Sequence, residues 1–213
     1  MRIILTAVDD ELATAWQEFC GHYDFVTIHK GSIFDLCTDA VVSPANSFGF
    51  MDGGIDLLYS HFFGWELQEK LQTVIKTIHN GELLVGNAEI VETGNSALPF
   101  LIAAPTMRVP MILRDSINPY LAAKAVFLLI RYGAFRHGIY QGKLVSDVVK
   151  EVAIPGLGTG VGQIGANTCA HQVATAIEEV ILGNTRFPKT WAEAQESHQR
   201  LYTDRIKNIQ FNN

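Results

Sequence analysis

The sequence is poor in charge and in cysteine, and it has no long hydrophobic run. Of its 213 residues, 18% are charged and 48% are hydrophobic. Disordered chains have the opposite balance, so this composition excludes general disorder and predicts a folded protein with a well-buried core. The longest apolar stretch, residues 120–130, contains Lys124 and is too short to span a membrane.

Positive charge is also scarce, with 16 lysines and arginines against 22 acidic residues and a formal net charge of −6. Proteins that bind phosphate backbones or anionic membranes carry a surplus of lysine and arginine. We therefore expect no general nucleic-acid binding and no membrane association. A small anionic ligand is compatible with this charge, provided that backbone groups hold it.

Three cysteines, Cys20, Cys37 and Cys169, are too few and too scattered for a disulfide framework or a metal site. The seven histidines show no spacing typical of a metal-binding motif. We expect reduced thiols, no metal and no cofactor. The apolar run at residues 3–8 is too short for a secretory signal, and a cytoplasmic location is therefore expected.

Apolar runs and helical periodicities alternate along the chain. Several runs are apolar throughout, which is typical of strands covered on both faces. The expected strands are residues 3–8, 25–29, 40–43, 83–91, 100–104 and 152–154. The expected helices are residues 9–20, 67–78, 118 to about 135, a helix that contains residues 169–181 and ends at 183–184, and 191 to about 206. This alternation predicts one α/β domain over residues 1–213, with three layers, α/β/α, and a mixed sheet of about six strands.

Two helix starts are marked by their sequences. Asn118 and Pro119 look like an N-cap followed by proline at the first helical position. Thr190 and Glu193 have the spacing of a capping box. That box predicts a C-terminal helix, about residues 190–207, appended to the core.

A first candidate loop follows the expected strand at residues 40–43 and leads into a helix. It reads Ser43-Pro44-Ala45-Asn46-Ser47-Phe48-Gly49-Phe50-Met51-Asp52-Gly53-Gly54-Ile55-Asp56. Gly53 and Gly54 allow close approach of a ligand to the backbone, and the helix start supplies free N–H groups and a positive dipole end. A tight strand-to-helix connection without a ligand explains the same glycines.

A second candidate loop joins another strand to a helix and contains five glycines. It reads Ile154-Pro155-Gly156-Leu157-Gly158-Thr159-Gly160-Val161-Gly162-Gln163-Ile164-Gly165. Each glycine costs backbone entropy, so the run favours a backbone nest for phosphate over a merely flexible loop. Neither loop contains lysine or arginine, so backbone N–H groups, helix dipoles and hydroxyls such as that of Thr159 would hold the anion.

The second loop also contains a literal G-x-G-x-x-G at residues 160–165. A dinucleotide-binding fold needs a second strand after the following helix. The chain runs instead from Leu182 through residues 183–188 into another helix, which disfavours that fold. No Gly-Lys-Ser/Thr follows the glycines, which excludes a P-loop.

Together the two loops resemble those of macro domains, the ADP-ribose-binding family. Residues 44–46 and 53–56 are similar to the family's N-A-A-N and G-G-G-V-D segments, and Asn46 and Asp56 keep the family's separation. Pro155 and residues 159–161 are similar to the P-A-I-S-T-G-V segment. Weaker echoes are Gly31-Ser32-Ile33, where the family tends to have G-D-I, and Thr93, Gly94, Leu98 and Pro99 in a T-x-G…L-P stretch.

The resemblance implies roles for these residues. The first loop would hold the distal ribose, with the Asn46 amide on a ribose hydroxyl, while the amides of residues 158–162 wrap the diphosphate. Ser32 would lie near the adenine edge. In hydrolytic members the acid at the Asp56 position helps to position or activate a water at the anomeric carbon. The predicted catalytic residues are therefore Asn46 and Asp56, and the predicted ligand-binding residues are Ser32, Ile33, Ala45, Gly53, Gly54, Ile55, Gly158, Thr159, Gly160, Val161 and Gly162.

Each role has a plainer alternative. Asp56 is also an acid in the first turn of a helix, where it satisfies the dipole, and Asn46 is also a turn residue that bonds its own backbone. Ser32 and Gly162 depart from the family, which has an acid and often an aromatic residue there. Asp52 adds a charge that is unfavourable beside a diphosphate, and it is a candidate second catalytic carboxylate.

Two functions stay open. The chain is either a hydrolase that releases ADP-ribose from a protein carboxylate, a nucleic acid or a small molecule, or a reader that binds ADP-ribose or a related nucleotide without turnover. The retained Asn46 and Asp56 favour the hydrolase.

Overall fold

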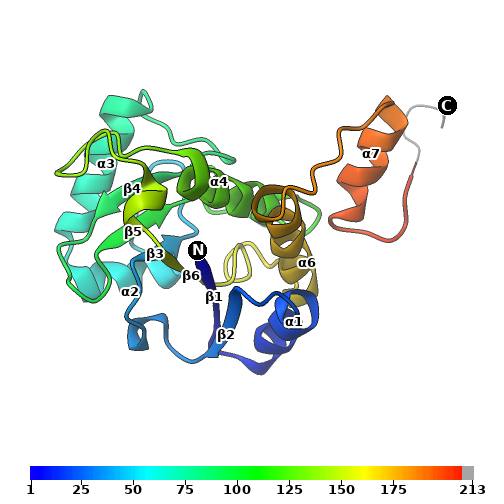
Figure 1. Cartoon of the computed structure of the whole chain (residues 1–213), viewed down its shortest axis with the longest axis horizontal. Helices are drawn as coiled ribbons and strands as arrows, with labels where there is room; N and C mark the ends of the chain where they lie inside the picture. Colours follow the sequence, from blue (N-terminus) through cyan, green and yellow to red (C-terminus); the bar gives the residue numbers. More distant parts are fainter. Residues whose placement is uncertain (208–213) are drawn as a thin grey trace.

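The computed structural model describes residues 1–207, and its centre is a six-stranded mixed sheet with the order β2-β1-β6-β3-β5-β4 (Figure 1). The strand β4 is antiparallel to β5, and every other neighbouring pair is parallel. The predicted α/β class and strand number are confirmed. The strands are β1 (Arg2–Ala7), β2 (Val26–Lys30), β3 (Ala40–Ser43), β4 (Glu89–Glu92), β5 (Phe100–Ala103) and β6 (Glu151–Ile154).

Helices cover both faces of the sheet (Figure 1). One apolar cluster joins the sheet to α1 (Asp10–Cys20), α4 (Asn118–Tyr132) and α6 (Ala166–Ala176), and a second joins it to α2 (Gly54–Phe63) and α3 (Glu66–Ile78). Successive strand residues point to opposite faces. Within β3, Val42 therefore belongs to the first cluster and Val41 to the second. This two-sided burial explains the continuous apolar runs. The short elements are η1 (Ile33–Asp35), α5 (Val145–Val148) and the π-helical η2 (Ile177–Ile181).

Two predicted boundaries are wrong for local reasons. The strand expected at residues 83–91 begins only at Glu89, the first residue of β4. The residues before it form a turn, in which Gly86 has φ +94° and the Asn87 N–H donates to the Leu84 carbonyl. Asn118 was expected to be the N-cap of a helix, but it is the first residue of α4, and Ile117 is the N-cap. The Asn118 side chain instead donates to the Thr106 carbonyl at 2.7 Å, and the helix ends at Tyr132.

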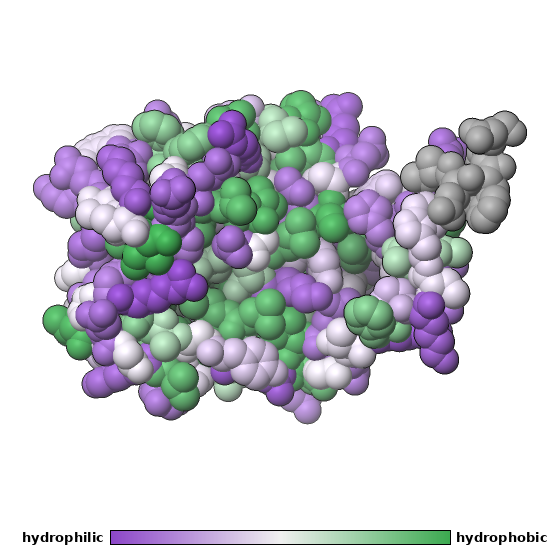
Figure 2. Space-filling view, turned by 90° about the horizontal axis from the view of Figure 1, so that it is seen from above, coloured by the Kyte–Doolittle hydropathy of each residue, from purple (hydrophilic) through white to green (hydrophobic). Residues whose placement is uncertain are grey.

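The C-terminal helix α7 (Trp191–Arg200) is shorter than expected and projects from the body in both views (Figures 1 and 2). Thr190 Oγ1 caps it by accepting from the Glu193 N–H at 3.1 Å. The Gln172 amide of α6 donates to the carbonyl of Leu201 just beyond it, at 3.0 Å. None of the helices in residues 1–207 is long and apolar enough to cross a membrane.

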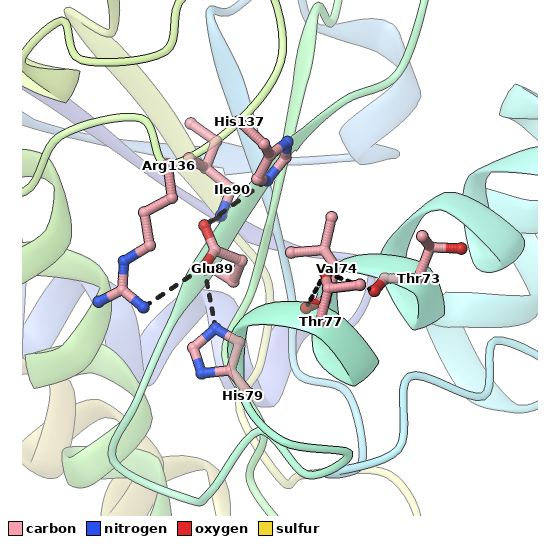
Figure 3. A network of polar contacts seen from close by, with 8 residues as sticks. All are labelled: Thr73, Val74, Thr77, His79, Glu89, Ile90, Arg136 and His137. Carbon is pink, nitrogen blue, oxygen red and sulfur yellow. Dashed lines mark hydrogen bonds and ion pairs between the residues drawn. The ribbon is translucent and has the colours of Figure 1, made fainter.

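The edge strand β4 carries a buried carboxylate, Glu89, which is 1% exposed (Figure 3). His79, at the end of α3, places Nε2 2.9 Å from Glu89 Oε2. Arg136 and His137 approach the same carboxylate at 3.9 and 3.8 Å. The cluster joins α3 and residues 136–137 to the edge of the sheet, and none of its members lines the cavity described below.

Candidate functional site

A cavity of about 320 Å³ opens where five parallel strands end. Ligands of open α/β sheets bind outside the carboxyl ends of the strands. The carboxyl end of β1 and the segments after β2, β1, β6, β3 and β5 contribute to the lining. These segments lie within residues 31–34, 6–9, 155–162, 44–58 and 106–110.

All residues predicted from the sequence to bind ligand or to act in catalysis line this one cavity. The two glycine-rich loops, which are about a hundred residues apart in the sequence, face it together because β3 and β6 are neighbours in the sheet. Their individual roles remain predictions. The geometry meets the main requirement of the sequence argument, which is that both loops reach one ligand.

Within the first loop, the Asn46 side chain is bonded to its own backbone. Its Oδ1 accepts from the N–H groups of Phe48 at 3.1 Å and Phe50 at 3.3 Å, and its Nδ2 donates to the Phe50 carbonyl at 2.8 Å. This is the plainer of the two predicted roles, a turn residue that stabilises the loop. One Nδ2 hydrogen has no partner in residues 1–207 and is available to a ligand.

Free amides at the start of α2 face the cavity. Gly53 is the N-cap and offers no side-chain cap, so the N–H groups of Gly54, Ile55 and Asp56 have no partner within the described chain. Gly54 has φ +58°, which favours glycine, and a Cβ on either glycine would meet nothing within 4 Å. The open space and the positive end of the helix dipole suit an anion.

The second loop supplies another row of free amides. Among the residues that the structure covers, the N–H groups of residues 158–162 have no hydrogen-bond acceptor. The loop is closed from within, since Ile164 N–H donates to the Gly158 carbonyl at 3.1 Å and Gln163 N–H to the Gly160 carbonyl at 3.0 Å. A Cβ at Gly162 would lie 2.5 Å from the Gly158 oxygen, so the tight turn requires glycine there. Such a concave row of amides is an anion-binding nest.

No lysine, arginine or histidine of the described residues lines the cavity. Its titratable side chains are the carboxyls of Asp9, Asp52 and Asp56. An anion bound here must therefore be held by the two rows of amides, as the loop sequences predict. Asp52 is exposed at the rim and lines the cavity with the first loop.

Asp56 is the buried acid of the cavity, with 7% of its surface exposed. Ser43, the last residue of β3, donates its Oγ–H to Asp56 Oδ1 at 2.5 Å. Burial raises the pKa of Asp56 to about 7, and the bond from Ser43 acts in the opposite direction. A carboxyl with this pKa exchanges its proton near neutral pH, which suits general acid or base chemistry.

Several lining residues were missed by the sequence analysis. They are not in the two glycine-rich loops but follow β1, β2 and β5, and the rule that sites lie at the carboxyl ends of parallel strands is the signal that finds them. The ones used below are Val8, Asp9, Leu12 and Phe34.

Comparison with known proteins finds a related sequence and solved structures of similar fold. A protein of Aquifex aeolicus (strain VF5), described only as uncharacterized, is 28% identical over 154 residues, which is 72% of this chain and 81% of that protein. The macrodomain of Mycobacterium tuberculosis DarG has a similar structure, with a TM-score of 0.57 and 21% identity over 72% of this chain and 90% of that chain. A mutant Oceanobacillus iheyensis macrodomain with ADPR gives a TM-score of 0.54 and 17% identity over 69% of this chain and 73% of that chain.

The family model described as Macro domain matches residues 42–173, which is more than half of the chain and includes both candidate loops. The chain belongs to the Macro domain family.

Proposed function

We propose that this protein binds ADP-ribose in the cavity and hydrolyses the bond that joins its distal ribose to an acceptor. The observation that carries the proposal is the convergence of two rows of free amides and a buried carboxyl, Asp56, on one cavity without a cation. The Oceanobacillus iheyensis macrodomain, which has a similar fold, is known with ADPR.

The diphosphate lies between the two rows of amides. The N–H groups of residues 54–56 and 158–162 point their hydrogens at it, and the dipole of α2 adds a positive potential. A hydrogen bond to a charged group contributes about 1.5–3 kcal/mol. A few such bonds therefore hold a diphosphate without lysine or arginine.

Asp56 then acts on a water molecule beside the distal ribose. The water oxygen attacks the anomeric carbon and gives its proton to the Asp56 carboxylate, while the bond from that carbon to the acceptor breaks. The acceptor leaves with the bonding electrons and takes a proton from solvent, so the products are ADP-ribose and the free acceptor. The carboxylate also stabilises the positive charge that develops on the sugar ring.

The second candidate function is a reader that binds ADP-ribose without turnover. Two observations favour it: Asp56 is only 7% exposed, and the Asn46 amide is mostly committed to its own loop. In that case Asp56 and Ser43 act as a structural pair beneath the ligand.

The test combines calorimetry with ADP-ribose and a release assay with an ADP-ribosylated protein. Wild type, Asp56→Asn and Asp52→Asn are compared with Asp10→Asn, a control acid that is exposed and outside the cavity. We expect wild type and the control to bind and release ADP-ribose, and Asp56→Asn to bind but to lose at least a hundredfold in release rate. Binding of ADP-ribose by wild type without release would contradict the hydrolase function and support the reader function. If wild type does not bind ADP-ribose, both functions are contradicted.

The compartment remains part of the proposal. Cys20, Cys37 and Cys169 are free thiols in the structure. Free thiols fit a reducing environment, and we therefore propose the cytoplasm.

A further inference from the structure

The cavity has a long axis that follows the edge of the sheet. Its lining segments come in the order of the strands, from β2 through β1, β6 and β3 to β5. Adjacent strands are about 4.8 Å apart. The amide rows belong to the middle and the β3 side of this line, where Asp56 also lies. If the proposed function holds, the distal ribose of ADP-ribose lies at Asp56. The nucleobase then lies at the opposite end of the cavity, beside β1 and β2.

Asp9 stands at that end with one carboxylate oxygen free. It is the N-cap of α1, where its Oδ1 accepts from the Leu12 N–H at 2.8 Å. Its Oδ2 has no partner among residues 1–207, and both Asp9 and Leu12 line the cavity. The cap fixes the side chain, so the free oxygen is a positioned acceptor that lacks a donor.

Ser32 lies on the neighbouring strand end and offers the complementary group. The Gly31 N–H donates to the Ala7 carbonyl at 2.9 Å, which keeps the segments after β1 and β2 side by side. Ser32 Oγ accepts from the Phe34 N–H at 3.2 Å, and no acceptor for its own hydrogen is present in the described part of the chain. Ser32 therefore presents a donor where Asp9 presents an acceptor.

Apolar side chains complete this end of the cavity. Val8, Ile33 and Phe34 line it, and the Phe34 ring is supported from behind by Phe62, with ring centroids 4.6 Å apart. A planar base has apolar faces and a polar edge. The walls suit its faces, and Asp9 with Ser32 suits its edge.

We propose that Asp9 and Ser32 select a purine with a 6-amino group and reject a 6-keto purine. Adenine places an amino donor beside a ring-nitrogen acceptor, so it satisfies both side chains, whereas guanine or hypoxanthine places a keto oxygen at the same position. A keto oxygen facing the Asp9 carboxylate leaves two acceptors without a hydrogen between them.

The test measures dissociation constants for ADP-ribose and for its 6-keto analogue, inosine diphosphate ribose, by calorimetry. Wild type is expected to prefer ADP-ribose about ten- to a hundredfold. Asp9→Asn keeps an N-cap of equal quality and adds an amide donor, so it should reduce the preference to threefold or less. Asp10→Asn is the matched control, because Asp10 is adjacent, exposed and paired with Lys30 outside the cavity, and it should keep the wild-type preference.

The outcomes separate this inference from the proposed function. Wild type that binds both ligands equally, or an Asp9→Asn variant that keeps the full preference, overturns the role of Asp9 while ADP-ribose binding stands. Wild type that binds neither ligand overturns the proposed function itself. A reduced preference in Asp9→Asn together with an unchanged one in Asp10→Asn supports the inference.

Discussion

The hydroxyl of Ser43 lies 2.5 Å from Oδ1 of Asp56 and donates to it. Ser43 ends β3, Asp56 is in the first turn of α2, and the whole first loop closes between them. Ser43 is fully buried, so no water competes for this bond. The contact links the sheet to the acid of the cavity and opposes the effect of burial on its pKa.

The first prediction rests on the proposed hydrolase function and concerns the pH dependence of ADP-ribose release. Because the Ser43 bond lowers the pKa of Asp56, Ser43→Ala should raise that pKa further. If the carboxylate is the active form, the rate rises with pH through about 7 in wild type, and the midpoint moves up by about one pH unit in the variant. Rates measured from pH 5 to 9 test this.

Ser47→Ala is the control for that experiment. Ser47 is also buried in the first loop, and its Oγ has no hydrogen-bond partner among the described residues. Removing this hydroxyl should leave the pH profile unchanged. An equal displacement of the midpoint in both variants would show that Ser43 acts through loop packing and not through its bond to Asp56.

The second prediction concerns stability. The pKa of Asp56 rises from its ordinary 3.8 to about 7 on folding. Well below pH 3.8 Asp56 is protonated in both states, and it adds no pH dependence to the free energy of unfolding. As pH rises from there to about 7, the unfolded chain loses the proton first, so the folded state loses stability, by up to about 4 kcal/mol.

Asp56→Asn removes this pH-dependent loss. The variant should exceed wild type in free energy of unfolding at pH 8, and the difference should shrink towards pH 4. Urea unfolding at the two pH values measures both quantities. A difference that is the same at pH 8 and pH 4 would contradict the assignment of a raised pKa to Asp56.

The third prediction compares two glycines of the second loop. A Cβ at residue 162 would lie 2.5 Å from the Gly158 oxygen, whereas one at residue 160 meets nothing within 4 Å. Gly162→Ala should therefore cost about 1–3 kcal/mol and weaken ADP-ribose binding. Gly160→Ala should change stability by less than about 0.5 kcal/mol. Thermal unfolding without ligand tests the pair, and equal losses would argue against the tight turn.

The fourth prediction concerns the Glu89 cluster of Figure 3. Glu89→Ala removes the partner of His79 from a buried position, which should cost about 3 kcal/mol in the free energy of unfolding. Arg136→Ala serves as control, because its side chain is 56% exposed and 3.9 Å from the carboxylate, and it should cost less than about 1 kcal/mol. The proposed release of ADP-ribose should be unaffected in Arg136→Ala, since the cluster lies outside the cavity.

Residues contiguous in the sequence account for the part of the site that could be predicted. The two loops, with Gly53-Gly54 and residues 158–162, adopt backbone conformations or close approaches that favour glycine. A run of glycines can be recognised in one sequence. Asp9 could not be found in this way. It looks like an ordinary helix cap, and its place in the cavity follows from the pairing of β1 with β6, which brings together residues far apart in the sequence.

Element boundaries failed for a related reason. Leu83 is apolar and fully buried, but its N–H donates to the Ser47 carbonyl in the first loop and not to a strand. Asn118 is a residue type common at N-caps, yet its side-chain amide donates a hydrogen bond to the carbonyl of Thr106, which lies after β5. Local propensity is weak compared with such tertiary bonds.

The sequence alone determined the alternation of buried strands and helices, the two glycine-rich loops and the absence of lysine and arginine from them. These features are local, because hydrophobic period, glycine and charge are properties of short segments. Only the tertiary structure decided which strand ends meet, that Ser43 bonds Asp56, and that Asp9 and Ser32 line the same cavity. Strand order brings those groups together, and it depends on contacts between distant segments that no local pattern encodes.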